Sequence, residues 1–130
     1  MNYIGIDLGT SAVKLLLVDE KGKILSELTR EYPLEFPQPG WSQQNPQDWK
    51  KAVLEGLQVL LQGFDGSQVA GIGCGGQMHG LVVLDEKDEV IRPAILWNDG
   101  RTAKQVQYLN ETVGKDKLSR YTANIAFAGF

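Results

Sequence analysis

A short polar segment near the N-terminus combines a carboxylate, a glycine, two hydroxyls and an amine. These are Asp7, Gly9, Thr10, Ser11 and Lys14, and they lie where one apolar run gives way to the next. A tight turn between two strands directs several backbone N–H groups into one concavity, and such a nest binds anions. Glycine lets the backbone approach a ligand closely, hydroxyl groups donate hydrogen bonds, and lysine adds positive charge. The segment therefore predicts a site for phosphate groups.

Asp7 has a predicted role of its own, because it ends the strand-like run 3–7. A carboxylate at this place could hold Mg²⁺ through water, since Mg²⁺ keeps much of its hydration shell. Positioned phosphates and neutralised charge are what phosphoryl transfer requires. An ordinary hairpin turn is the alternative, because Asp, Gly, Thr and Ser are common in turns for local reasons. A Walker loop is excluded, since neither Gly-Lys pair of the chain is followed by Ser or Thr.

A second candidate segment, Gln77, Met78 and His79, follows the glycine-rich stretch 71–76. The glycines fit Gly-x-Gly-x-x-Gly, but a dinucleotide fingerprint opens a helix, and here the β-like run 81–84 follows. We interpret them as permitting close backbone approach at a strand end. His79 can donate or accept a hydrogen bond and Met78 offers adaptable packing, which suits a neutral polar ligand. The alternative is structural, with His79 bonded to the local backbone and Met78 in the core.

A third polar cluster, Asn98, Asp99 and Arg101, follows the apolar run 94–96 and Trp97. Each member also has an ordinary structural interpretation. Asn98 or Asp99 could cap the helix that follows, and Arg101 could form an ion pair with Asp99. Trp97 could lie in the core, with its indole N–H bonded to a partner. Because these roles are sufficient, the cluster alone does not predict a binding site.

The pattern of apolar residues predicts a mixed α/β domain. Short apolar runs between turn residues indicate strands, and apolar residues three or four positions apart indicate a helix. Asn45 and Pro46 mark the start of the first helix and Gly63 its end, whereas Gly114 closes the second. We expect first an antiparallel meander of three strands at residues 3–7, 13–19 and 24–32. A helix at 46–62 and a strand at 69–74 follow. An inserted hairpin at 81–85 and 90–96 and a helix at 102–113 complete the expected order.

Four segments of the chain together point to one family. They are Asp-x-Gly-Thr-Ser-x-x-Lys at 7–14, Trp-Ser-Gln-Gln-Asn-Pro at 41–46, Gly-Gln-Met-His-Gly at 76–80 and Pro-Ala-Ile-Leu-Trp-Asn-Asp-Gly-Arg at 93–101. In this order they resemble the FGGY family of carbohydrate kinases, and within it the xylulokinases most. The resemblance implies the ribonuclease-H-like fold of the actin-like ATPases, with residues 1–130 forming an incomplete N-terminal domain.

The resemblance also implies an activity, the transfer of the ATP γ-phosphoryl group to a primary hydroxyl of a sugar in the presence of Mg²⁺. The most similar members convert D-xylulose to D-xylulose 5-phosphate. The turn residues would bind ATP. The sugar would be bound, directly or through supporting contacts, by Gln77, Met78, His79, Asn98, Asp99 and Arg101. The general-base aspartate and the second domain of the family are expected beyond residue 130, so no catalytic residue is assigned and the chain alone should be inactive.

Two alternatives stay open. The first is another FGGY kinase, such as a ribulokinase, a gluconokinase or a glycerol kinase, because half of a sugar pocket does not settle the substrate. Glycerol kinases of the family carry Arg-Glu where this chain has Met78 and His79, which argues against that member. The second is a non-catalytic actin-like nucleotide-binding module, which would have no use for the segments 76–80 and 97–101.

Composition narrows the class further. Of the 130 residues, 42% are hydrophobic and 22% are charged, with a net charge of -3. The two signs of charge are interspersed, so nucleic-acid binding is not expected. No apolar run approaches the roughly 20 residues of a membrane-spanning helix, so no membrane is expected either. The single Cys74 fits a reducing cytoplasm. An apolar face left for the rest of the family's fold would favour self-association, which allows a homodimer.

Overall fold

The contacts within the chain divide it into two units. The computed structural model describes residues 1–130. The first unit comprises Met1–Leu34 and Asn45–Gln77, and the second comprises Glu35–Gln44 and Met78–Phe130. Each unit is therefore assembled from two separate stretches of the chain.

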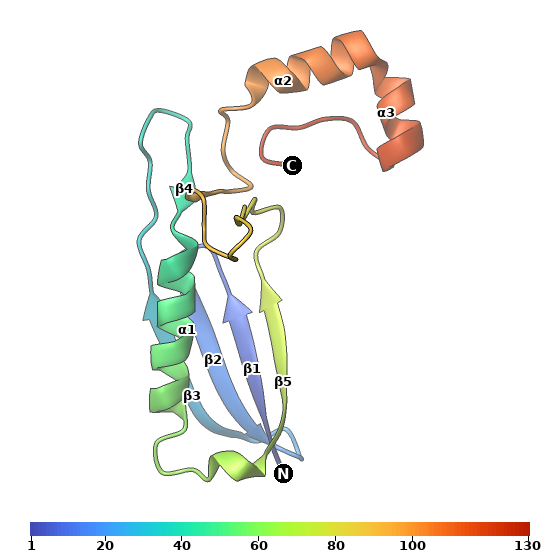
Figure 1. Ribbon diagram of the computed structural model, residues 1–130. Coiled ribbons are helices and arrows are strands. Elements are labelled where there is room, and N and C mark those ends of the chain that lie inside the picture. Colours follow the sequence, from blue (N-terminus) through green and yellow to red (C-terminus); the bar gives the residue numbers. More distant parts are fainter. The chain divides into compact units, whose positions relative to one another are not determined.

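The first unit is built on a mixed sheet (Figure 1). Its strands are β1 (Asn2–Leu8), β2 (Ala12–Asp19), β3 (Ile24–Glu31) and β5 (Val69–Gly76). They lie in the order β3-β2-β1-β5, with the first three antiparallel and β5 parallel to β1. A short 3-10 helix (Gly66–Gln68) leads into β5. The predicted antiparallel meander is confirmed, and so is the later strand.

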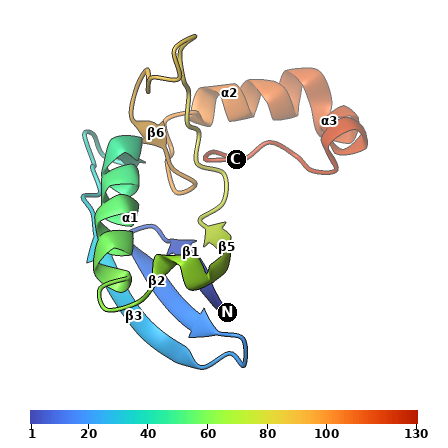
Figure 2. The ribbon, with the colours of Figure 1, turned by 60° about the horizontal axis from the view of Figure 1, so that its bottom comes forward.

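The helix α1 (Pro46–Leu60) lies across one face of this sheet, over β2 and β3 (Figures 1 and 2). It begins as predicted, because the side chain of Asn45 accepts a hydrogen bond of 3.0 Å from the Gln47 N–H and a proline occupies the first turn. It ends shortly before Gly63, whose φ of +81° suits glycine. Both predicted ends of this helix are therefore confirmed.

The core of the first unit lies between α1 and β2. Alternate residues of β2, namely Val13, Leu15 and Leu17, are fully buried, because successive side chains of a strand point to opposite faces. They cluster with Leu60 of α1. At Gly56 the helix comes so close to Leu15 that an added Cβ would collide with that side chain. Glycine at this position therefore sets how closely the helix approaches the sheet.

Replacing Gly56 with alanine should destabilise the first unit by overpacking. We expect Gly56→Ala to lower the free energy of unfolding by about 1–3 kcal/mol, even though alanine is the better helix former. Denaturant unfolding measures the change. Gly66→Ala is the control, since a Cβ there would meet no atom within 4 Å. A Gly56→Ala protein as stable as the original would contradict the close approach.

The second unit contains little regular sheet. β4 (Gln43–Gln44) pairs antiparallel with β6 (Ala94–Ile95). The hairpin predicted within 81–96 is present, with isolated antiparallel bridges between Leu84 and Val90 and between Leu81 and Ile95. Its two regular strands were a wrong prediction, apart from the two residues of β6.

The turn of this reversal explains the missing strands. The carboxylate of Asp85 accepts hydrogen bonds of 2.8 Å from the Lys87 N–H and 2.9 Å from the Glu89 N–H. Asp88 within the turn has a left-handed φ of +61°. Side-chain bonds of this kind offer the backbone an alternative to a sheet ladder. The turn therefore forms locally, and beyond it the two arms pair only at isolated positions.

The predicted second helix is present but irregular. It comprises α2 (Ala103–Tyr108) and a π-helical turn (Leu109–Gly114). Gly114, with a φ of +95°, ends the π-helical turn as predicted. A further helix, α3 (Lys115–Thr122), follows directly and was not predicted. None of the helices combines the length and the apolar character that spanning a membrane would need.

Candidate functional site

The turn between β1 and β2 is tight, as predicted. The Gly9 N–H donates a hydrogen bond of 3.0 Å to the Ala12 carbonyl oxygen. A Cβ at position 9 would lie 3.0 Å from the same oxygen, so glycine is the residue that fits. Thr10 and Ser11 lie at the tip of the turn, between these two residues. The backbone geometry is therefore that of a narrow hairpin with its polar residues at the end of the sheet.

Asp7 and Lys14 lie on the face of the sheet opposite α1. Lys14 alternates with the buried residues Val13 and Leu15, and Asp7 is its direct partner across β1 and β2. The Lys14 ammonium group forms an ion pair of 3.3 Å with Glu27, and both side chains are more than half exposed. Exposed pairs contribute little to stability. Lys14 can therefore leave Glu27 for a stronger anion at low cost.

A shallow concavity of about 390 Å³ lies on this face, and Asp7 and Lys14 line it together with Gly73 and Gly75 of β5. The chain contains no group of three or more His, Cys, Asp or Glu that could hold a metal ion by itself. Mg²⁺ does not need one, because it is commonly held by one or two carboxylates, water and the phosphates of its ligand. The exposed carboxylate of Asp7 fits that requirement.

Tyr32 holds the turn from the side of β3, and it was not predicted from the sequence. Its hydroxyl donates to the Gly9 carbonyl, and its backbone N–H donates to the Ser11 carbonyl at 3.2 Å. Burial, and to a smaller extent the negative charge of Asp7, raise the pKa of Tyr32 to about 12, so the hydroxyl remains a donor at neutral pH. The available signal was its place at the end of the third predicted strand, beside the turn of the meander.

Gln77 approaches the same turn from the side of β5. Its backbone N–H donates to the Leu8 carbonyl at 2.9 Å, and its side-chain oxygen accepts a hydrogen bond of 3.3 Å from the Thr10 hydroxyl. Gln77 was grouped with Met78 and His79 as a sugar-binding residue. In the structure it contacts the turn of the first unit, whereas Met78 and His79 begin the second unit.

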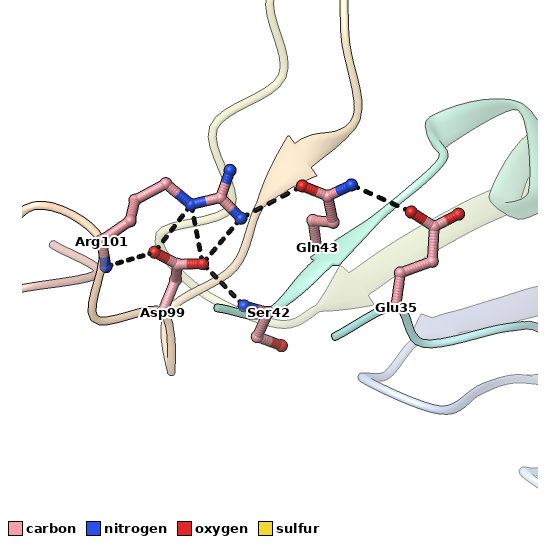
Figure 3. A network of polar contacts seen from close by, with 5 residues as sticks. All are labelled: Glu35, Ser42, Gln43, Asp99 and Arg101. Carbon is pink, nitrogen blue, oxygen red and sulfur yellow. Dashed lines mark hydrogen bonds and ion pairs between the residues drawn. The ribbon is translucent and has the colours of Figure 1, made fainter. Parts of the chain in front are cut away.

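In the second unit, Asp99 is the centre of a buried polar network (Figure 3). Its carboxylate accepts hydrogen bonds of 2.6 Å from the Ser42 N–H and 2.8 Å from the Arg101 N–H, and it forms an ion pair of 2.8 Å with the Arg101 guanidinium. Only 2% of Asp99 is exposed. Burial alone would raise the pKa of Asp99, but the hydrogen bonds from Arg101 and Ser42 outweigh it and lower the pKa below the ordinary value of 3.8.

Arg101 is held from several directions. Its guanidinium donates to the Gln43 side-chain oxygen at 3.1 Å and lies over the Trp41 ring, 4.0 Å from the centroid. Gln43 in turn donates to Glu35 at 3.0 Å (Figure 3). Asp99 and Arg101 are thus bonded to each other and to nearby protein groups. This arrangement agrees better with a supporting role than with direct contact to a ligand.

Trp97 and Asn98 are exposed between two buried residues. Leu96 is fully buried and its N–H donates to the Ser42 carbonyl at 3.1 Å. The Asp99 N–H donates back to the Leu96 carbonyl at 3.1 Å, which closes the turn. Trp97 is 43% exposed, so it is not a core residue. The network therefore holds a short loop whose outward residues are Trp97 and Asn98.

His79 has an unusual backbone conformation, with a φ of +59°. Few residues other than glycine adopt this region, and such positions are frequent at binding sites. The His79 ring stacks on Phe130 with 4.1 Å between centroids. Together with Leu81 and Thr102 these residues line a cavity of about 320 Å³. Met78 is 64% exposed, so the interpretation of this side chain as core is wrong.

The sequence matches the FGGY family of carbohydrate kinases, N-terminal domain, over residues 2–130. The chain belongs to the FGGY family. A relative within it, the xylulose kinase of Lactococcus lactis, is 46% identical over 134 residues, which cover 100% of this chain and 26% of the relative. The chain thus spans about a quarter of the length of that FGGY kinase.

Solved FGGY kinases share the fold. A "xyloylose kinase" from Brucella ovis is 40% identical with a TM-score of 0.91, covering 100% of this chain and 27% of that chain. A gluconate kinase from Lactobacillus acidophilus is 32% identical with a TM-score of 0.84, and the match covers 92% of this chain and 24% of that chain. The predicted family is therefore confirmed, and so is the ribonuclease-H-like fold of the actin-like ATPases.

Removing the carboxylate of Asp99 should strongly destabilise the second unit of this FGGY chain. We expect Asp99→Ala to cost about 3–5 kcal/mol, because it leaves the buried Arg101 guanidinium without its anion. Glu55→Ala is the control, since it breaks an exposed pair with Lys51 and should change stability by at most about 0.5 kcal/mol. Denaturant unfolding of both variants measures the difference. Equal effects would show that the Asp99 pair is no more important than a surface pair.

Acid should also destabilise the second unit through Asp99. Because the folded-state pKa lies below 3.8, the folded state binds fewer protons than the unfolded state between the two pKa values. This contribution is present above pH 3.8 and is lost as the pH falls through the folded-state pKa. The measurement is the difference in unfolding free energy between the original protein and Asp99→Asn, followed from neutral pH to about pH 2. A difference that does not shrink in acid would contradict the assignment.

Proposed function

We propose that the protein to which this chain belongs transfers the γ-phosphoryl group of ATP to a primary hydroxyl of D-xylulose, giving D-xylulose 5-phosphate. The observation that carries the proposal is the identity over the whole chain to a xylulose kinase. The tight β1–β2 turn supports it, because backbone amides beside a carboxylate and a lysine are suited to hold ATP phosphates.

In this proposal the turn residues divide the work of binding ATP. The N–H groups of Thr10 and Ser11 would face the phosphates. The Gly9 N–H is bonded across the turn to Ala12. Gly9 would therefore contribute only space, because it has no side chain to keep the phosphates away from the backbone. Asp7 would hold hydrated Mg²⁺, which would neutralise phosphate charge. Lys14 would exchange Glu27 for a phosphate oxygen, because the existing pair is exposed and weak.

The sugar would be bound by the outward residues of the second unit. His79 offers a hydrogen-bonding ring on a strained backbone, and Met78 offers an exposed apolar surface. Asn98 offers an amide that can donate and accept. Asp99 and Arg101 would act by holding the loop that carries Asn98, since both are engaged with protein groups.

Gluconate is the second candidate substrate, because the solved gluconate kinase from Lactobacillus acidophilus resembles this chain closely. A carboxylate substrate needs a cation or several donors in its site. Arg101 is the one arginine among the proposed sugar residues, and it is already paired with Asp99. Gluconate would have to break that buried pair, so a neutral ketose is the better fit.

The intact protein should release ADP in a sugar-dependent manner when supplied with ATP and Mg²⁺. We expect the highest kcat/KM with D-xylulose among D-xylulose, L-ribulose, gluconate and glycerol. The 130-residue chain alone should release none, because we propose that the rest of the protein supplies the general base. A coupled ADP assay decides both points. A higher kcat/KM with gluconate would make gluconate the proposed substrate in place of D-xylulose. The absence of any sugar-dependent ADP release would overturn the kinase proposal.

Replacing His79 should weaken sugar binding selectively in the intact protein. We expect His79→Ala to raise the KM for D-xylulose about tenfold or more, the effect of losing a specific hydrogen bond, with the KM for ATP unchanged. Asp88→Ala is a matched control, because Asp88 is another exposed non-glycine residue with a left-handed φ, here +61°. Backbone strain alone would affect both variants alike. If both raise the sugar KM equally, or neither does, His79 has no sugar contact.

A further inference from the structure

Two residues outside the β1–β2 turn flank it on both sides. The strand order β3-β2-β1-β5 puts the end of β3 beside β2 and the end of β5 beside β1. Tyr32 directly follows β3, and Gln77 directly follows β5. Tyr32 donates a hydrogen bond to the Gly9 carbonyl in the turn, and Gln77 donates one to the Leu8 carbonyl at the end of β1. The turn is therefore held between the two neighbouring strand ends.

Tyr32 fixes the direction of a peptide group at the tip of the turn. Its hydroxyl donates to the Gly9 carbonyl. The Gly9 carbonyl and the Thr10 N–H belong to the same planar trans peptide group and point in opposite directions. When Tyr32 binds the carbonyl on one side, the Thr10 N–H must face the other way. One hydroxyl thus sets the orientation of an amide that the proposed phosphate site uses.

Gln77 fixes the preceding peptide group by the same geometry. Its N–H donates to the Leu8 carbonyl at 2.9 Å, so the Gly9 N–H of that peptide group points the opposite way, toward the Ala12 carbonyl that it bonds at 3.0 Å. The side chain of Gln77 adds a second contact, because its oxygen accepts from the Thr10 hydroxyl at 3.3 Å. Two successive peptide groups of the turn are therefore oriented from outside it.

We propose that Tyr32 and Gln77 are positioning residues for ATP, which hold the β1–β2 turn in the orientation that binds phosphate before ATP arrives. The inference rests on the proposed kinase function and deepens it. Donors that are oriented in advance bind an anion without the cost of ordering the loop. Tyr32 is 8% exposed, so water competes little for its hydrogen bond. For Gln77 the proposal replaces a sugar contact with a role at the phosphates.

The ratio of the two Michaelis constants tests the proposal in the intact protein. We expect Tyr32→Phe, which keeps the buried ring, to raise the KM for ATP about fivefold, the effect of one lost hydrogen bond, and to leave the KM for D-xylulose within about twofold. Gln77→Leu should act in the same direction. The controls are Tyr108→Phe and Gln58→Leu, which change exposed residues of the same types and should alter neither constant.

Three outcomes overturn the proposal. One is an unchanged KM for ATP in both variants, and another is a rise in both constants together with a lower melting temperature, which would mean general damage. The third is a Gln77→Leu protein in which the KM for the sugar alone rises, which would indicate that Gln77 contacts the sugar. If Tyr32→Phe does not fold, the KM values of Gln77→Leu still test the proposal. Placing 4-aminophenylalanine at position 32 should leave the KM for ATP unchanged, because this side chain keeps a hydrogen-bond donor at the same place.

Direct binding of ADP separates this inference from the kinase proposal. Calorimetric titration of the intact protein with ADP and Mg²⁺ needs no sugar and no turnover. If the protein binds ADP but phosphorylates no sugar, the proposed function fails, and a weaker ADP affinity in Tyr32→Phe still supports the positioning role. If the protein phosphorylates D-xylulose and Tyr32→Phe binds ADP with unchanged affinity, the positioning role fails and the kinase proposal stands.

Discussion

The packing of α1 on β2 is the contact on which the geometry of the first unit depends. Burial of Val13, Leu15 and Leu17 fixes which face of β2 meets the helix, since a slip of one residue would turn every side chain to the other face. Lys14 alternates with these residues and is therefore fixed on the opposite face. The antiparallel register then places Asp7 beside it. One face of the sheet thus provides stability, and the other carries the charged groups next to the turn.

The second unit depends on a different interaction, the buried ion pair of Asp99 and Arg101. Ser42 and Gln44 are buried as well, so much of what is buried in this unit is polar. Apolar contacts tolerate sliding, whereas hydrogen bonds to a carboxylate are directional and become stronger away from water. The pair carries a desolvation cost, which its several hydrogen bonds offset. A loop held in this way keeps Asn98 in one place without an extensive apolar core.

Local patterns were enough to predict the features that near neighbours in the chain decide. The alternation of β2, the cap at Asn45 and the narrow turn at Gly9 are of this kind, and all three are present. The contacts of Arg101 with Trp41 and Gln43 were not predictable, because these residues meet only after distant segments pair through β4 and β6. The hairpin between 81 and 96 was predicted correctly as a chain reversal, but its expected strands were not, because the two arms pair only at isolated bridges beyond a turn held by the Asp85 side chain. Periodicity therefore identifies elements, and long-range pairing decides which polar groups they bring together.

The segment Gly-Gln-Met-His-Gly shows how adjacent residues come to belong to different units. The N–H of Gln77 bonds to the Leu8 carbonyl, which extends the pairing of β5 with β1 by one residue beyond the strand. His79, two positions later, has a left-handed φ of +59° that a strand cannot contain. The backbone therefore leaves the sheet within these positions, and Met78 and His79 belong to the second unit. Gln77 and His79 are near neighbours in the sequence, and the strained His79 backbone lies where the chain leaves the sheet.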